Sequence, residues 1–234
     1  MGKDKLRKFN ENETFKNVIQ PTLEEVLRKD YTLKGKWKSE IFKNENPLVI
    51  ELGCGKGEYS VGLASKYTKK NFIGIDIKGA RIWRGAKTSL NEEINNVVFL
   101  RTRIEFINSF FAKDEVSEIW ITFPDPQKEF HRRRKRLTSP IFLNYYKQFL
   151  SNNGVVHLKT DSDLLYNYTL DIIQHNKIEL VFHTSDLYHS SLQDLTHGIK
   201  TFYEAKYLAV GKNINYIQFR LQNNRVYEDL PKEE

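Results

Sequence analysis

The chain has 234 residues, of which 39% are hydrophobic and 29% are charged. A chain of this length buries one good core, and none of its apolar runs approaches the ~20 residues that span a bilayer, so we expect a single-core protein with no membrane association. The net charge of +7 favours a polyanionic partner. The single cysteine, Cys54, excludes an internal disulfide framework and favours a reducing cytoplasm over secretion.

Residues 1–46 are polar and rich in lysine, and we expect them to form an N-terminal arm laid on the main domain, residues 47–234. From Pro47 onward, short apolar runs alternate with longer amphipathic stretches, which is typical of an α/β fold with a mostly parallel sheet and helices on both faces. The sequence predicts seven strands, at 48–52, 72–76, 97–100, 118–123, 155–159, 178–183 and 214–221. The predicted helices lie near 58–67, 80–94, 104–110, 140–150 and 162–175. The last two strands have no final crossover helix, which predicts an antiparallel edge strand.

The first predicted strand runs into a glycine turn, Gly53-Cys54-Gly55-Lys56-Gly57, where a ligand can approach bare backbone. A phosphate-binding P-loop requires Gly-Lys-Ser/Thr and is absent from this turn. A dinucleotide loop requires Gly-x-Gly-x-x-Gly, and here the third glycine is displaced. Glu51, just before the turn, would repel a pyrophosphate but would tolerate a cationic ligand.

S-adenosylmethionine is such a cation, with a sulfonium, an ammonium and a ribose diol. The second predicted strand ends at Asp76, about twenty residues past the glycines, where an acid accepts hydrogen bonds from ribose hydroxyls. NAD enzymes share an acid at this site, so Asp76 alone does not discriminate. Glu51 and the glycine spacing favour the methyl donor over a nicotinamide dinucleotide. Cys54 lacks a paired histidine and is interpreted as a small residue that fits the turn rather than as a nucleophile.

The fourth predicted strand leads into Phe123-Pro124-Asp125-Pro126, followed directly by a dense cationic run. Proline fixes its own backbone and restricts the residue before it, so we expect Asp125 in a stiff, non-helical segment. The run Lys128–Arg136 holds six Lys or Arg against one acid, a local charge of +5 out of the chain's +7. This concentration favours a nucleic-acid partner, and the alternative is a solvated basic loop.

Taken together, these motifs resemble the bacterial tRNA (guanine-N7)-methyltransferase family, TrmB, from about Pro47 to Leu221. The resemblance includes Thr160-Asp161 after a strand, and Thr201-Phe202-Tyr203-Glu204 followed by Gly211. It implies a Rossmann-like S-adenosylmethionine-dependent methyltransferase domain. It also implies methyl transfer to N7 of a tRNA guanine, usually nucleotide 46 in the variable loop.

The family's roles carry over residue by residue, with Asp125 as the catalytic centre. Donor contacts are implied for Glu51, Gly53, Gly55, Gly57, Asp76, Thr102, Arg103 and Asp125. Thr102 and Arg103 stand where the family often has an acid or amide. Contacts to tRNA are implied for Lys128, Glu129, Arg132, Arg133, Arg134, Asp161, Thr201 and Glu204. Two departures are Glu129, where the family often has lysine, and His131, where arginine is usual.

Guanine N7 carries an exposed lone pair at neutral pH, so no proton has to be removed before it attacks a sulfonium methyl. We therefore expect Asp125 to orient the guanine and to stabilise the developing positive charge. Two of the residues implied to contact guanosine also have simpler interpretations. Asp161 can be the N-cap of the helix that begins near Ser162, and Glu204 can be a surface acid.

Rival functions differ in what they leave unexplained. A non-catalytic methyltransferase fold that binds RNA as an assembly factor has no need of the donor motifs. A small-molecule methyltransferase leaves the cluster at Arg132–Arg136 without a role. The histidines lack partners at ligand spacing, so no metal is expected, and neither is an obligate protein partner.

Overall fold

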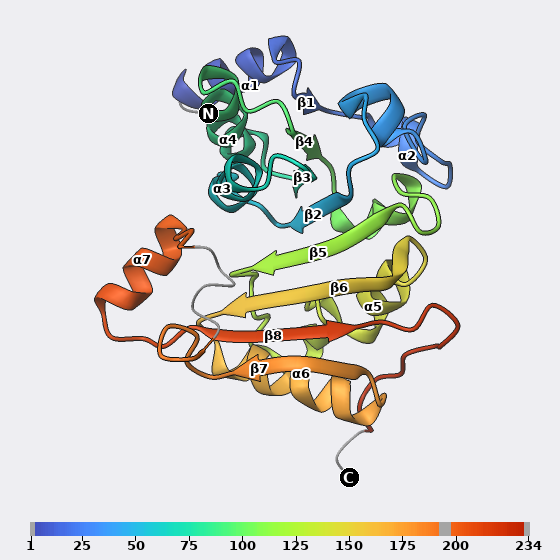
Figure 1. Ribbon diagram of the computed structural model, residues 1–234, viewed down its shortest axis with the longest axis vertical. Helices are drawn as coiled ribbons and strands as arrows, with labels where there is room; N and C mark the ends of the chain where they lie inside the picture. The colour runs from blue at the N-terminus through green and yellow to red at the C-terminus, as the bar shows by residue number, and fades with distance from the viewer. Residues whose placement is uncertain (1–2, 192–197, 232–234) are drawn as a thin grey trace.

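A computed structural model describes residues 3–191 and 198–231. Their strands form one sheet of eight, in the order β1-β4-β3-β2-β5-β6-β8-β7 (Figure 1). The strands are β1 (Val18–Ile19), β2 (Leu48–Leu52), β3 (Asn71–Asp76), β4 (Val97–Arg101), β5 (Val116–Thr122), β6 (Leu150–Thr160), β7 (Glu179–Thr184) and β8 (Asn215–Arg220). The predicted α/β fold with a mostly parallel sheet is confirmed.

The antiparallel element is β8, which lies between β6 and β7 and runs antiparallel to both. The predicted antiparallel pair at this edge is therefore confirmed. The predicted number of seven strands is wrong, because β1 adds an eighth at the opposite edge, where Val18 pairs with Phe99 of β4 in parallel register. A two-residue strand has no alternation that a sequence pattern could reveal.

The helices cover both faces of the sheet, as Figure 1 shows. Their bounds are α1 (Lys3–Thr14), α2 (Leu23–Val26), η1 (Trp37–Phe42), α3 (Glu58–Lys66), α4 (Gly79–Asn91), η2 (Ile104–Ser109), η3 (Phe130–Lys135), α5 (Pro140–Tyr146), α6 (Asp163–His175) and α7 (Phe202–Ala209). The prediction placed an element at η2, which is a 3-10 rather than an α-helix. It also missed α7.

Two hydrophobic clusters occupy the two faces of the sheet. Along β2, Leu48 and Ile50 belong to one cluster, whereas Val49 between them belongs to the other. Successive side chains of a strand point to opposite faces, so a buried parallel strand supplies both layers. This burial fixes the register of β2, β3 and β5, and with it the edge at which their carboxyl ends meet.

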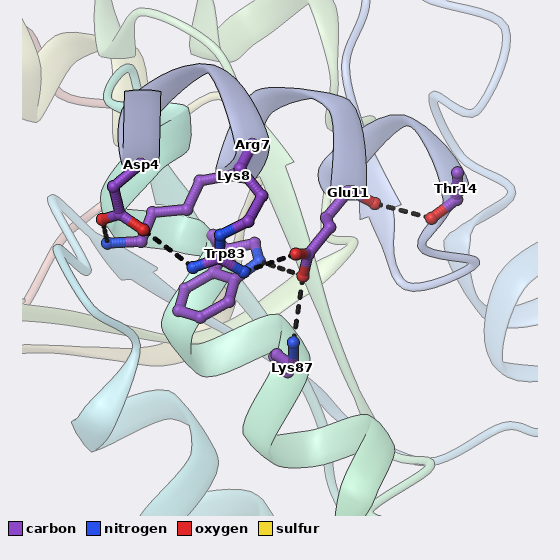
Figure 2. A network of polar contacts seen from close by, with 7 residues as sticks. All are labelled: Asp4, Arg7, Lys8, Glu11, Thr14, Trp83 and Lys87. Atoms are coloured by element: carbon purple, nitrogen blue, oxygen red, sulfur yellow. Dashed lines mark hydrogen bonds and ion pairs between the residues drawn. The ribbon is translucent and has the colours of Figure 1, made fainter. Parts of the chain in front are cut away.

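The N-terminal segment is tied to the main domain through α4 (Figure 2). Trp83 Nε1 of α4 donates a hydrogen bond to Glu11 Oε2 of α1 over 2.8 Å, and Lys87 Nζ lies 3.0 Å from the same oxygen. The cations of Arg7 and Lys8 each lie 5.0 Å from the Trp83 ring centre. The boundary between an arm at 1–46 and a domain at 47–234 stays a prediction. No helix within the described ranges is long and apolar enough to cross a membrane.

Candidate active site

A cleft of about 870 Å³ opens where β3, β4 and β5 end. It brings together six of the site residues that the sequence predicted, namely Gly53, Asp76, Thr102, Arg103, Asp125 and Arg134. Apolar side chains of α5 form part of its wall, and cations of α4 and η3 line it as well. The lining residues that were not predicted include Lys78, Arg81, Lys135, Ile141, Phe142 and Tyr145.

The glycine turn reaches the cleft at Gly53, and its glycines serve two purposes. Gly53, Gly55 and Gly57 have φ of +75°, +56° and +71°, in the left-handed region that favours glycine. A Cβ on Gly57 would lie 2.5 Å from the Phe99 ring, so Gly57 permits α3 to pack on the sheet. A Cβ on Gly53 would meet none of the described atoms within 4 Å, which leaves open space for a ligand.

Asp76 links the end of β3 to this turn. Its Oδ2 accepts a hydrogen bond from Gly55 N over 3.0 Å, and its Oδ1 accepts one from Lys78 N over 2.8 Å. The side chain is buried but still lines the cleft. Each carboxylate oxygen keeps a further lone pair, so Asp76 can hold the turn and accept hydrogen bonds from a ligand at once.

Glu51 is buried behind the turn, and the described residues that line the cleft do not include it. Its carboxylate accepts hydrogen bonds from the Ser60 amide over 2.9 Å and from the hydroxyls of Ser60 and Thr122. Burial nevertheless raises the pKa of Glu51 to about 7. Glu51 can therefore act on a cationic ligand through its field without touching it.

Cys54 is a buried free thiol within the same turn. Burial, with Glu51 and Asp76 nearby, raises the pKa of Cys54 well above its ordinary value. A thiol without a thiolate is a poor nucleophile, so the structure agrees with the interpretation of Cys54 as a packing residue.

Asp125 is exposed and also lines the cleft, in a loop with unusual backbone geometry. Phe123 and Gln127 on either side of it have φ of +47° and +46°. Asp125 Oδ1 accepts a hydrogen bond from Gln127 N over 3.0 Å, which closes a tight turn. The carboxylate keeps an unshared oxygen for a ligand. Non-glycine residues in this region are strained, and such strain is often retained at functional loops.

Arg136 supports the loop of Asp125 from beneath. It is 6% exposed, and its guanidinium donates hydrogen bonds to the carbonyls of Pro126 and Gln127 over 3.0 and 3.1 Å. The guanidinium carbon also lies 4.3 Å from the Tyr168 ring centre. The last cation of the basic run is therefore a structural part of the site.

Most of the rest of the basic run forms η3, and its side chains are exposed to different degrees. Lys128, Glu129 and Arg132 are exposed, and the Arg134 side chain is 70% exposed. Arg133 packs on the Phe130 ring, 4.2 Å from its centre, and lies 3.5 Å from Asp229. Arg134 Nε also lies 3.8 Å from Asp229, but its side chain is 70% exposed against 18% for Arg133, so Arg132 and Arg134 are better placed for contact with a polyanion.

The residues predicted to contact guanosine lie outside the described lining of the cleft. Asp161 follows β6 and lies 3.2 Å from Lys212 Nζ. The N-cap of α6 is Ser162, whose hydroxyl accepts from Leu165 N over 3.3 Å, so the interpretation of Asp161 as that N-cap is wrong.

Thr201 and Glu204 begin α7 together. Thr201 Oγ1 accepts from Glu204 N over 3.2 Å, and Glu204 Oε2 accepts from Thr201 N over 3.3 Å. Glu204 is 0% exposed and forms an ion pair with Lys159, so its interpretation as a surface acid is wrong. The spacing Thr-x-x-Glu is the sequence signature of such a capping box, and it could have revealed α7.

The glycine turn, the acid at the end of β3 and the acid after β5 together define a Rossmann-like S-adenosylmethionine-dependent methyltransferase. Two solved structures share this fold. One is titled "Structure of an Antibiotic Related Methyltransferase", with a TM-score of 0.55 and 17% identity over 83% of this chain and 96% of that chain. The other is the 16S rRNA methyltransferase KamB, with a TM-score of 0.57 and 11% identity over 76% of this chain and 88% of that chain.

Sequence relatives narrow this class to one family. The family described as "Putative methyltransferase" matches residues 45–217. A tRNA (guanine-N(7)-)-methyltransferase from Christiangramia forsetii is 54% identical over 94% of this chain and 99% of its own length. One from Bacteroides fragilis is 51% identical over 94% of this chain and 87% of its own. The chain belongs to the bacterial tRNA (guanine-N7)-methyltransferase family, TrmB.

Within the described ranges, no group of three or more His, Cys, Asp or Glu side chains is arranged to hold a metal ion. The expectation that the protein works without a metal stays a prediction.

Proposed function

We propose that the protein transfers the methyl group of S-adenosylmethionine to N7 of a guanine in tRNA, at nucleotide 46 of the variable loop. The observation that carries this proposal is that Asp125, Gly53 of the glycine turn and the cation of Arg134 line one cleft, in a chain of this family. The two tRNA (guanine-N(7)-)-methyltransferases described above match over 99% and 87% of their own lengths.

The residues at the cleft fit the methyl donor. Gly53 presents open backbone, and Asp76 offers lone pairs to the hydroxyls of a ribose. Glu51, buried behind the turn, favours a positively charged ligand. Thr102 and Arg103 lie at the same cleft and are proposed to border the adenine. When bound, the donor supplies a methyl group on a sulfonium.

Asp125 has the two properties that the reaction needs on the guanine side. Its carboxylate can accept hydrogen bonds from the guanine N1–H and amino group, which orients N7 without removing a proton. Its negative charge also favours the cation that develops on the purine ring. We therefore assign Asp125 the roles of orienter and electrostatic stabiliser.

The tRNA backbone is proposed to lie along η3. Arg134 lines the cleft and Arg132 is exposed on the same short helix, with Lys128 and Glu129 just before it. Asp161 and Thr201 are proposed to contact the guanosine from the end of β6 and the start of α7. The rival function, a non-catalytic RNA-binding or assembly factor, gives the donor-side residues no role.

The decisive experiment is methylation of total tRNA that lacks N7-methylguanosine, followed by mapping of the modified nucleotide. We expect one labelled guanine, at nucleotide 46. Modification at another guanine would overturn the position, and absence of transfer would overturn the function. Asp125→Asn is the matched control, because the amide oxygen can still accept from Gln127 N while the charge is lost.

A further inference from the structure

Lys159 connects the loop that carries Asp125 with the start of α7, where Thr201 and Glu204 lie. Its backbone lies opposite Thr122 in the parallel register of β5 and β6, and its carbonyl accepts from Phe123 N over 2.8 Å. Phe123 is the residue that starts the Asp125 loop. The main chain of Lys159 therefore fixes where that loop leaves the sheet.

The side chain of Lys159 reaches the start of α7. Its Nζ lies 2.7 Å from Glu204 Oε1, and both side chains are 0% exposed. The ammonium also lies 4.9 and 5.9 Å from the ring centres of Tyr59 and Phe123. The Tyr188 hydroxyl donates to the same Glu204 oxygen over 2.8 Å. Burial lowers the pKa of Lys159, and the Glu204 carboxylate opposes that effect.

Glu204 in turn fixes the first turn of α7, which we call the guanosine-side segment, Thr201–Glu204. Two further contacts hold this segment against the glycine turn. Phe202 N donates to Glu58 Oε2 over 2.9 Å, and Lys56 Nζ lies 4.3 Å from the Phe202 ring centre. The segment thus touches the donor side at α3 and the catalytic side through Lys159.

The guanosine-side segment presents two aromatic rings to solvent. Phe202 is 57% exposed and Tyr203 is 45% exposed, with their ring centres 5.7 Å apart. Exposed aromatic rings beside an RNA site are suited to stack on an unstacked base. A shift of this turn by about 1 Å would misplace the base, and misplacement of that size can cost about 10²-fold in rate.

We propose that Lys159 and Glu204 are a pair of positioning residues, which dock the guanosine-side segment in register with the Asp125 loop. On this view, which rests on the proposed function, the Glu204 carboxylate is bound by Lys159, Tyr188 and Thr201 rather than by the guanine. A buried ion pair accepts few geometries, so it specifies the docking of α7 more sharply than apolar contacts would.

The test compares Lys159→Met, Glu204→Gln and the double variant. Either single change strands one buried charge, and we expect kcat at saturating donor and tRNA to fall by about 10²-fold, with donor affinity unchanged. The double variant removes both charges. Its amide can still accept from Thr201 N and donate to the Tyr188 hydroxyl, so kcat should return to within roughly tenfold of wild type.

A matched control lies two residues earlier on the same strand. His157 is buried, and its Nε2 lies 3.1 Å from Glu118 Oε1. The double variant His157→Leu, Glu118→Gln removes a contact between a buried and a half-buried side chain, and neither side chain is paired with α7. We expect it to lower the melting temperature while kcat stays near wild type.

Two results would overturn the proposal. One is a folded double variant as inactive as Glu204→Gln, which would mean that the carboxylate itself contacts the guanine. The other is a wild-type kcat in Lys159→Met. If the single variants do not fold, the kcat of the double variant relative to wild type still tests the proposal. Wild-type protein that methylates no tRNA would refute the proposed function instead.

Discussion

The donor side and the guanosine side of the site are built in different ways. The donor side is a continuous turn, Gly53–Gly57, closed by Asp76 through a hydrogen bond to Gly55 N. The guanosine side joins segments far apart in the chain, through the contact of Lys159 with Glu204 and the support of the Asp125 loop by Arg136. Local backbone geometry therefore sets the donor side, whereas tertiary electrostatics set the guanosine side.

The two sides also differ in how their buried carboxyl groups, Glu51 and Glu204, are stabilised. Glu51 on the donor side is held by hydroxyl and amide donors, and burial raises its pKa to about 7. Glu204 on the other side has a cation 2.7 Å away. Within the described ranges, the carboxylate of Glu51 thus lacks a cationic partner, which a positively charged ligand could supply, whereas the carboxylate of Glu204 is already paired with Lys159. Single substitutions should consequently affect binding on the first side and turnover on the second.

The largest effect is expected at Asp125. Asp125→Ala should lower kcat by about 10²–10³-fold at saturating substrates, because a preorganised carboxylate facing the developing charge is removed. Asp125→Asn keeps the acceptor for Gln127 N and separates charge from loop geometry. Single-turnover rates check this. Near wild-type rates in Asp125→Asn would contradict the role of the charge and show that only the loop shape matters. The affinity for tRNA should stay unchanged in Asp125→Ala and in Asp125→Asn.

Arg136 should behave unlike the other cations of its run. Arg136→Met removes two charged hydrogen bonds to the loop carbonyls of Pro126 and Gln127, and we expect a loss of about 2 kcal/mol in unfolding free energy. Turnover should fall with it, because the Asp125 loop loses its support. Urea denaturation and kcat measure the two effects. If Arg136→Met weakens tRNA binding but leaves the unfolding free energy and kcat unchanged, as expected for an exposed cation, this role is contradicted.

Donor affinity should depend on pH through Glu51. With a pKa of about 7, Glu51 is mostly protonated in the free protein at pH 6, and a cationic donor favours its ionised form. Donor binding should therefore strengthen by about tenfold from pH 6 to pH 8, as the ionised fraction rises through that pKa. Calorimetry on Glu51→Gln should show no such dependence, whereas Asp76→Ala should bind more weakly at every pH.

The same shift affects stability. Folded Glu51 keeps a proton that the unfolded chain releases above its ordinary pKa of 4.5. Its contribution therefore disfavours the folded state increasingly as pH rises from 4.5 to 7, and Glu51→Gln should lose that slope. Thermal unfolding across this range checks the sign, and parallel profiles for the two proteins would contradict it.

The smallest effect is expected on the exposed part of η3. Replacing Arg132 and Arg134 with alanine should reduce the log–log salt slope of tRNA binding by about 0.7–0.9 for each phosphate that is no longer neutralised. Donor affinity should barely change. Lys69→Ala with Lys113→Ala is a matched pair of exposed cations before β3 and β5, at the far ends of these strands. If both double variants keep the wild-type slope, the RNA lies elsewhere.

Much of the donor side could be predicted from sequence, because its residues follow strands whose apolar patterns are plain. Asp76 and the glycine turn lie where the pattern placed them, at one edge of the sheet. The roles of Lys159 and Arg136 could not be predicted. A lysine within a strand and an arginine within a basic run carry no local sign of burial, since their partners come from distant segments.

The central claim is that this site presents guanine N7 to a methyl donor, with the donor side and the guanosine side meeting at Asp125. The most direct measurement is methyl transfer to tRNA in which the target guanine is replaced by 7-deazaguanine, which has carbon in place of N7. We predict unchanged tRNA binding and complete loss of transfer, with full transfer to the guanine-containing control. Methylation of the 7-deazaguanine tRNA at that nucleotide would contradict the account.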